Sequence, residues 1–206
     1  MILAIETSAE PASLALYDGE TVVSRSFPNR NQVNVPLADE VAALWDPQQV
    51  RLECVLVGAG PGSYSGARVG LATGEAIAIA QGCPVVTLPS VVGIAHEEEF
   101  LLIGDARRGA YFRMAPGELT PKVEGSEAFA AAVEAYRGSL VSFEPVEKLP
   151  LSAAVQTQVA VVSSTAEQLV QYWLGLSAEE QQEYTERARE VIYLRPPNIT
   201  KAKSPF

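Results

Sequence analysis

A glycine-rich corner at residues 58–70, GAGPGSYSGARVG, constrains the fold of this chain more than any other stretch. The apolar run at residues 55–57 precedes it and is short enough for a buried strand. A proline-free segment at residues 67–81 follows and ends at a glycine, which is typical of a helix with a glycine stop. The sequence therefore predicts a strand, a tight loop and a helix in succession, with Ser63 or Ser65 as the helix cap.

A glycine corner at the start of a helix can bind an anion, but this corner lacks both known fingerprints. The phosphate loop requires a lysine after its last glycine, and the corner contains no lysine. The dinucleotide motif G-x-G-x-x-G fails because Ser63 and Ser65 stand where its third glycine is required. The residue types favour a structural turn over phosphate binding, and the candidate residues of the corner are Gly60, Gly62, Ser63 and Arg68.

Small residues recur every four positions along the predicted helix, at Gly66, Gly70, Gly74 and Ala78, and so form one ridge. A glycine inside a helix costs about 1 kcal/mol relative to alanine. Three of them therefore indicate the close approach of another element. That element is either the protein's own sheet or a helix of a partner chain, and the spacing alone favours neither.

The composition describes a folded chain of one or two domains. It has 206 residues, of which 48% are hydrophobic and 19% charged. No apolar run reaches membrane length and no basic region precedes the first apolar residues, so we expect a cytoplasmic protein without a membrane partner. The two cysteines, Cys54 and Cys83, fit a reducing compartment and are expected to be buried. The net charge of -10 argues against nucleic-acid binding by this chain alone.

The first half is predicted to run strand, strand, strand, helix, strand, helix, strand, helix. The expected strands lie at residues 2–5, 12–17, 20–26, 55–57 and 85–88, and a short helix is expected from Ser90 to His96. The first helix has Asn34 as its expected cap and Pro36 in its first turn, and Leu37 and Val41 belong to its apolar face.

The second half is expected to repeat the order of strands followed by helices. Strands are predicted at residues 100–104, 110–114, 139–143 and 159–162, and helices at residues 127–136, after Ser164 and from Ser177 to about residue 190. Ser164 with Glu167, and Ser177 with Glu180, have the spacing of capping boxes. The shared order weakly indicates a duplicated unit, although no repeat is visible residue by residue.

Four motifs resemble the bacterial TsaB (YeaZ) family. Residues 60–70, GPGSYSGARVG, resemble its signature G-P-G-S-[FY]-T-G-[LV]-R-[IV]-G, which is the specific one. Residues 5–8, IETS, resemble its first-strand I-D-T-S, and residues 105–109, DARRG, resemble its D-A-R-x-[GN]. Residues 193–195, YLR, resemble its late Y-L-R. The resemblance covers nearly the whole chain, although the second half is short and divergent.

The resemblance implies a two-lobed, actin-like and ribonuclease-H-like α/β fold with a reduced second lobe. Residues 1–97 would form the first lobe and residues 98–206 the second. It also implies a role in making threonylcarbamoyladenosine beside the tRNA anticodon. In that family the protein resembles the catalytic subunit TsaD but is a non-catalytic scaffold. It pairs with TsaD, the small ATPase TsaE joins the pair, and tRNA is reached only through the complex.

The same resemblance implies where the partner binds. A pair of helices from each chain would form a four-helix contact, in which a homodimer and the pairing with TsaD compete for one surface. The expected interface residues are those of the small-residue ridge, Gly66, Gly70, Gly74 and Ala78, together with Leu37 and Val41 of the preceding helix.

The residue types argue against catalysis by this chain. TsaD-like catalysis uses a metal held by two histidines four residues apart, and His96 is the single histidine here. Actin-like kinases place a metal-binding aspartate where this chain has Glu6, and Mg²⁺ demands near-ideal geometry. Glu6, Thr7 and Ser8 are therefore expected to be a vestigial nucleotide loop, with no catalytic residue, metal or cofactor. The alternative is a free-standing actin-like nucleotide hydrolase or kinase.

Overall fold

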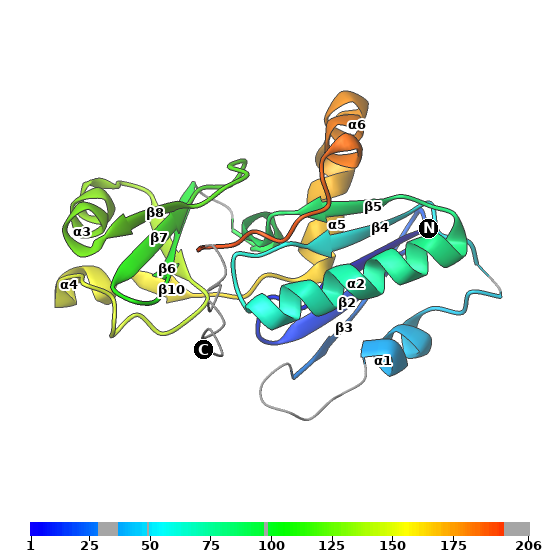
Figure 1. The fold of residues 1–206 in the computed structure, drawn as a ribbon, viewed down its shortest axis with the longest axis horizontal. Helices are drawn as coiled ribbons and strands as arrows, with labels where there is room; N and C mark the ends of the chain where they lie inside the picture. The colour runs from blue at the N-terminus through cyan, green and yellow to red at the C-terminus, as the bar shows by residue number, and fades with distance from the viewer. Residues whose placement is uncertain (29–36, 49, 97–98, 196–206) are drawn as a thin grey trace, which may run out of the picture.

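The computed structural model describes residues 1–28, 37–48, 50–96 and 99–195, and two five-stranded sheets form its framework (Figure 1). The expected helix cap Asn34 and the expected first-turn Pro36 lie outside the described residues. Among the described helices, none is long and apolar enough to cross a lipid bilayer.

The first sheet has the strand order β3-β2-β1-β4-β5. Its strands are β1 (Ile2–Glu6), β2 (Ala12–Tyr17), β3 (Val22–Phe27), β4 (Cys54–Gly58) and β5 (Val85–Leu88). β1 pairs antiparallel with β2 and parallel with β4. Every residue of β1 and β4 is buried, as expected for central strands covered on both faces.

Helices cover both faces of this sheet (Figure 1). On one face, α1 (Leu37–Leu44) and α2 (Tyr64–Gln81) pack over an apolar cluster that includes Leu3, Val41 and Val57. On the other face, α5 (Ala166–Gly175) lies against β1, β2 and β4, and α6 (Ala178–Glu186) lies against β5.

The second sheet has the order β10-β9-β6-β7-β8, which is the topology of the first sheet written in reverse. Its strands are β6 (Phe100–Asp105), β7 (Ala110–Met114), β8 (Lys122–Gly125), β9 (Ser139–Ser142) and β10 (Val159–Val161). In both sheets the first three strands are antiparallel neighbours, and the last two run parallel to the first. The duplicated unit that strand order weakly indicated is therefore visible in the topology.

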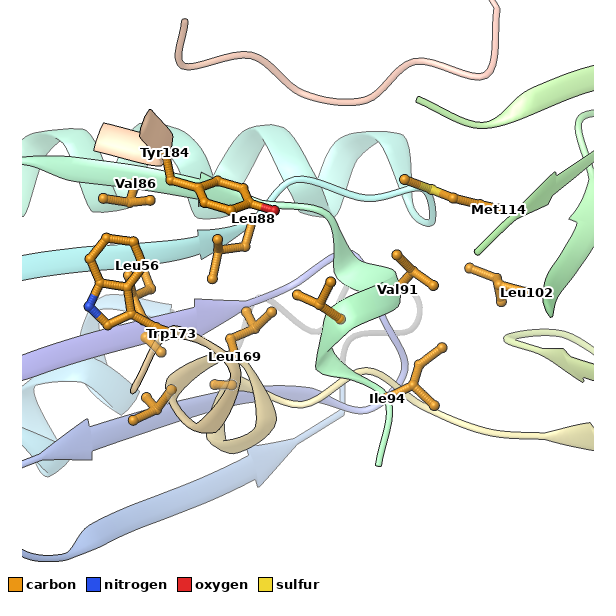
Figure 2. Packing of buried hydrophobic residues seen from close by; sticks show 14 of the residues in the cluster. Leu56, Val86, Leu88, Val91, Ile94, Leu102, Met114, Leu169, Trp173 and Tyr184 are labelled. Carbon is orange, nitrogen blue, oxygen red and sulfur yellow. The ribbon is translucent and has the colours of Figure 1, made fainter. Parts of the chain in front are cut away.

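The two sheets share one apolar core through the short 3-10 helix η1 (Ser90–Gly93). Figure 2 shows Val91 and Ile94 between Leu169 of the first lobe and the side chains of Leu102 and Met114 in the second. Helix α3 (Ser126–Ala135) packs on the second sheet over a separate cluster, and α4 (Ala153–Gln156) adds one short turn.

Several predicted elements need correction. The cap of α5 is Thr165, whose hydroxyl accepts a hydrogen bond from the amide of Gln168, because the predicted cap Ser164 points instead into the interior. The helix expected up to His96 ends at Gly93, and α6 ends at Glu186 rather than near residue 190. The lobes also do not divide at one point in the sequence, because α5 and α6 return to the first sheet.

Candidate functional site

Glu6, at the end of β1, is a carboxylate buried in a network of hydroxyl groups, with no exposed surface. Its Oε1 accepts hydrogen bonds from the amide of Ser8 (2.8 Å) and from Ser8 Oγ (2.7 Å). Its Oε2 accepts one from Ser164 Oγ (2.8 Å). Ser8 Oγ lies 2.8 Å from Ser90 Oγ, which in turn accepts from the amide of Gly60 (2.9 Å). Protein groups therefore satisfy both carboxylate oxygens, as a buried charge requires.

The glycine corner packs against the turn that follows β1. The amide of Ser63 donates to the main-chain oxygen of Ser8 (2.7 Å), and a Cβ added at Gly62 would overlap that same oxygen. Gly60 has φ +91° and requires the freedom of glycine. The corner thus packs against the protein's own backbone, as expected for a structural turn.

The N-terminus of α2 is capped as the sequence predicts. Ser63 is the cap, and its hydroxyl accepts from the amide of Gly66 (3.1 Å). At the other end, Gly82 has φ 68° and stops the helix in the left-handed conformation.

The small-residue ridge of α2 faces the protein's own sheet, so its assignment to a partner interface is wrong. Gly66, Gly70, Gly74 and Ala78 are all buried. A Cβ at Gly66 would overlap the main-chain oxygen of Thr7, one at Gly70 would overlap Thr7 Oγ1, and one at Gly74 would lie 2.7 Å from a methyl group of Val57. The ridge lets α2 approach β1 and β4 closely, which leaves the opposite face of α2 for other contacts.

That opposite face borders an apolar groove of about 680 Å³ between α1 and α2. The groove is lined by Ala38, Val41, Ala42, Trp45, Asp46, Pro47, Ala72, Thr73, Ala76 and Ile77. Four of these residues are exposed alanines spaced four positions apart, Ala38 and Ala42 on α1 and Ala72 and Ala76 on α2. Val69 and Ile79, on the same helix α2, are exposed by 52% and 82%. Of the two predicted interface residues on α1, Val41 lines the groove, while Leu37 packs partly buried against the core beneath it.

The glycine-rich motif at residues 60–70 and the YLR motif at residues 193–195 meet at the N-terminal end of α2. The ring of Tyr193 lies 5.2 Å from that of Tyr64, and Arg68 lies over the Tyr64 ring at 5.4 Å. The amide of Ile192 donates to the main-chain oxygen of Ala59 (2.8 Å). These contacts hold the segment around Tyr193 on the glycine corner. Arg68 is an exposed side chain with no ion pair among the described residues.

The turn after β6 occupies the position in the second sheet that the Glu6 turn occupies in the first. Asp105 Oδ1 accepts from the amide of Arg107 (2.6 Å), just as Glu6 accepts from an amide two residues ahead. The Arg107 guanidinium pairs with Asp105 (3.2 Å) and with Glu144 (3.0 Å). Asp105 and Arg107 thus pair with each other, and Arg107 links this turn to Glu144.

The remaining candidates for chemistry, His96 and the two cysteines, do not belong to a cluster of potential metal ligands within the described residues. His96 is exposed, its ring lies 5.1 Å from that of Phe100, and no group of three or more potential metal ligands occurs in the described ranges. Burial raises the pKa of the Cys54 thiol to about 12, which keeps it protonated and unreactive. Cys83 is only partly buried, contrary to expectation.

The comparison with known families decides the assignment. The family model described as TsaD, tRNA N6-adenosine threonylcarbamoyltransferase, matches residues 30–173. The chain belongs to this family, and within it to the TsaB (YeaZ) type.

Curated relatives of this TsaB-type chain are similar over part of their length. It is 34% identical over 123 residues to an uncharacterised protein of Mycobacterium leprae, with 52% of this chain and 33% of that protein covered. It is 30% identical over 98 residues to the tRNA threonylcarbamoyladenosine biosynthesis protein TsaB of Haemophilus influenzae, with coverages of 46% and 42%. The chain thus spans less than half the length of these relatives.

Solved structures show the fold. A Pseudomonas aeruginosa protein described as similar to the peptidase YeaZ aligns with a TM-score of 0.63 at 21% identity, covering 94% of this chain and 99% of that one. YeaZ from Pseudomonas aeruginosa aligns with a TM-score of 0.62 at 19% identity, covering 93% and 98%. The two-lobed actin-like fold expected from the motifs is therefore confirmed.

Within this fold, the sequence motifs led to Glu6, Thr7 and Ser8 but missed their partners. Ser90 and Ser164 complete the network, and the hydroxyl of Ser13 accepts from the amide of Ala166 (2.9 Å). Isolated serines carry no signal in a single sequence. Ser90 and Ser164 each stand at the start of an expected helix in the sequence, which indicates a helix cap and not a contact with Glu6. Chemically, the arrangement holds a buried carboxylate in place with two donors on Oε1 and one on Oε2.

Proposed function

We propose that this chain is a non-catalytic scaffold subunit in the biosynthesis of tRNA N6-threonylcarbamoyladenosine, where it pairs with a TsaD-like catalytic subunit. The family match and the name of the Haemophilus influenzae relative support the pathway. The burial and hydrogen bonding of the Glu6 carboxylate are the main support for a non-catalytic role. The carboxylate that stands where actin-like enzymes hold a metal-bound nucleotide is fully buried and hydrogen-bonded to Ser8 and Ser164.

The groove between α1 and α2 is the proposed docking surface for the TsaD-like subunit. Its exposed alanines, Ala38 and Ala42 on α1 and Ala72 and Ala76 on α2, permit close approach of a partner's helices. Ile79, also on α2, is exposed by 82% and would be covered if the partner extends along this helix. A homodimer would use the same groove and would compete with the heterodimer, because the partners share a fold. A TsaE-like ATPase would then join the pair.

The alternative function, a free-standing nucleotide hydrolase or kinase, requires a carboxylate available to a metal-bound nucleotide. Opening Glu6 to such a ligand would remove donors from Oε1 or Oε2 and would expose a turn that the backbone of the glycine corner covers. The scaffold role requires no such rearrangement, and we therefore prefer it.

The proposal is tested by reconstitution with the TsaD-like and TsaE-like proteins of the same organism, tRNA and a threonylcarbamoyl donor. We expect the chain alone to show no ATPase, peptidase or transferase activity, because no group of three or more potential metal ligands forms among the described residues and the sequence has one histidine. Modified tRNA should form in the full mixture and should fall to background when this chain is left out. Turnover by the pure chain that disappears in Glu6→Ala, or full activity without the chain, would contradict the proposal.

We also expect the isolated chain not to bind tRNA at physiological salt. It carries 25 acidic residues against 15 lysines and arginines, whereas binding to nucleic acid depends on neutralising phosphates with basic side chains. An electrophoretic mobility assay with unmodified tRNA measures this directly, and the TsaD-like subunit with this chain serves as the comparison. A shift produced by micromolar concentrations of the chain alone would count against the expectation.

A further inference from the structure

The chain crosses between the lobes twice, and the two crossings lie side by side where they meet the first lobe. The first crossing leaves η1 through Ile94 toward β6, and the second returns from β10 through Ser164 to α5. Ile94 and Ser164 form an antiparallel bridge, and the amide of Thr165 donates to the main-chain oxygen of Gly93 (2.8 Å). The two connections between the lobes are therefore joined to each other by main-chain hydrogen bonding at this point.

The Glu6 carboxylate contacts the second crossing directly and the first crossing through Ser8. Oε2 accepts from Ser164 Oγ in the second crossing (2.8 Å), across 158 positions of sequence. Oε1 accepts from Ser8 Oγ, which lies 2.8 Å from Ser90 Oγ at the start of the first crossing. Because Glu6, Ser8, Ser90 and Ser164 are all buried, water offers no substitute for these hydrogen bonds.

Two glycines make room for this arrangement. A Cβ added at Gly58 would overlap Glu6 Oε2, and one added at Gly93 would overlap Ser164 Oγ. The glutamate is also required by its length, since aspartate would shorten the reach by one carbon–carbon bond, about 1.5 Å. The departure from aspartate at position 6 thus coincides with a contact that aspartate could not make.

We propose that Glu6 is an interlobe clamp, a positioning residue that fixes the angle between the two lobes from inside the protein. It ties the end of β1 to both crossings without a bound ligand. The relative position of the lobes is then an intrinsic property of the chain and is independent of nucleotide. This inference goes beyond the proposed function and does not depend on any partner.

The test compares four variants by single-molecule energy transfer between dyes on Ala80→Cys in α2 and Glu134→Cys in α3, with Cys83 replaced by serine. Cys54 is buried and stays unlabelled. We expect the parent protein to give a single narrow peak of transfer efficiency.

Glu6→Asp and Ser164→Ala remove the contact to the second crossing, and we expect both to broaden or shift this peak. Glu6→Gln retains an oxygen for Ser8 and an amide donor for Ser164, and its transfer efficiency should match that of the parent. Glu20→Asp, on an exposed turn, is the matched control.

Hydrogen exchange provides the second measurement. Loss of one buried hydrogen bond should accelerate exchange at the amides of Thr165 and Ala166 by about tenfold in Glu6→Asp and Ser164→Ala, while β6 keeps its protection. The clamp is refuted if both folded variants keep the parent peak, if exchange rises equally in both sheets, or if magnesium-ATP restores the parent peak of Glu6→Asp. Should Glu6→Asp fail to fold, Ser164→Ala decides the matter, because it removes only one hydroxyl.

Discussion

Replacing Gly66 with alanine is expected to destabilise the protein by about 3 kcal/mol, the upper end of the usual cost of overpacking. The added Cβ would overlap the main-chain oxygen of Thr7, and a main chain cannot move aside as a flexible side chain does. The Thr7 hydroxyl also donates to the main-chain oxygen of Gly66 (2.8 Å), so a displaced helix would lose this bond as well. For a chain of this size, the expected loss in melting temperature is roughly 6–12 °C.

Gly175→Ala is the matched control for this measurement. Gly175 is also helical, at the end of α5, but a Cβ added there meets no atom within 4 Å. The same exchange should therefore be neutral or stabilise by up to about 1 kcal/mol. Thermal unfolding followed by circular dichroism measures both variants. A Gly66→Ala protein that melts with the parent would show that the ridge does not pack tightly on the sheet.

The second large effect is expected at the groove, where Ala76→Arg should weaken binding of a TsaD-like subunit by at least about 100-fold, or roughly 2.7 kcal/mol. Ala76 is exposed and lines the groove, so an arginine is tolerated in the free chain but would be buried without a partner charge in an apolar contact. The melting temperature of the free variant should match that of the parent. Titration calorimetry with the purified subunit measures the affinity.

Ala131→Arg, on the exposed face of α3 in the second lobe, is the control for added charge and should bind as the parent does. Self-association in sedimentation is expected to fall together with heterodimer formation in Ala76→Arg, because both would use one surface. Parent-like affinity of this variant for the TsaD-like subunit would exclude the groove as the docking site.

Local signals in the sequence predicted the elements around the site. The apolar run before the glycine corner became β4, Ser63 caps α2, and Gly82 ends it in the left-handed conformation. These features depend on residues within a few positions of one another, such as a hydroxyl beside the free amides of a helix start. β8 has no such local signal, because Lys122–Gly125 is mostly exposed and carries no apolar alternation. The sequence analysis therefore did not predict this strand.

The sequence by itself determined that α2 carries a ridge that another element must approach closely, and that the first strand ends in a glutamate where actin-like enzymes have an aspartate. Only the tertiary structure decided that the ridge faces β1 and β4, that α5 returns to the first sheet, and that Glu6 meets Ser164. Helical spacing shows that one face of the helix carries only small residues, but it does not show which element packs against that face. The partner of a buried carboxylate is selected by the burial of groups far apart in the chain, and no local pattern encodes that choice.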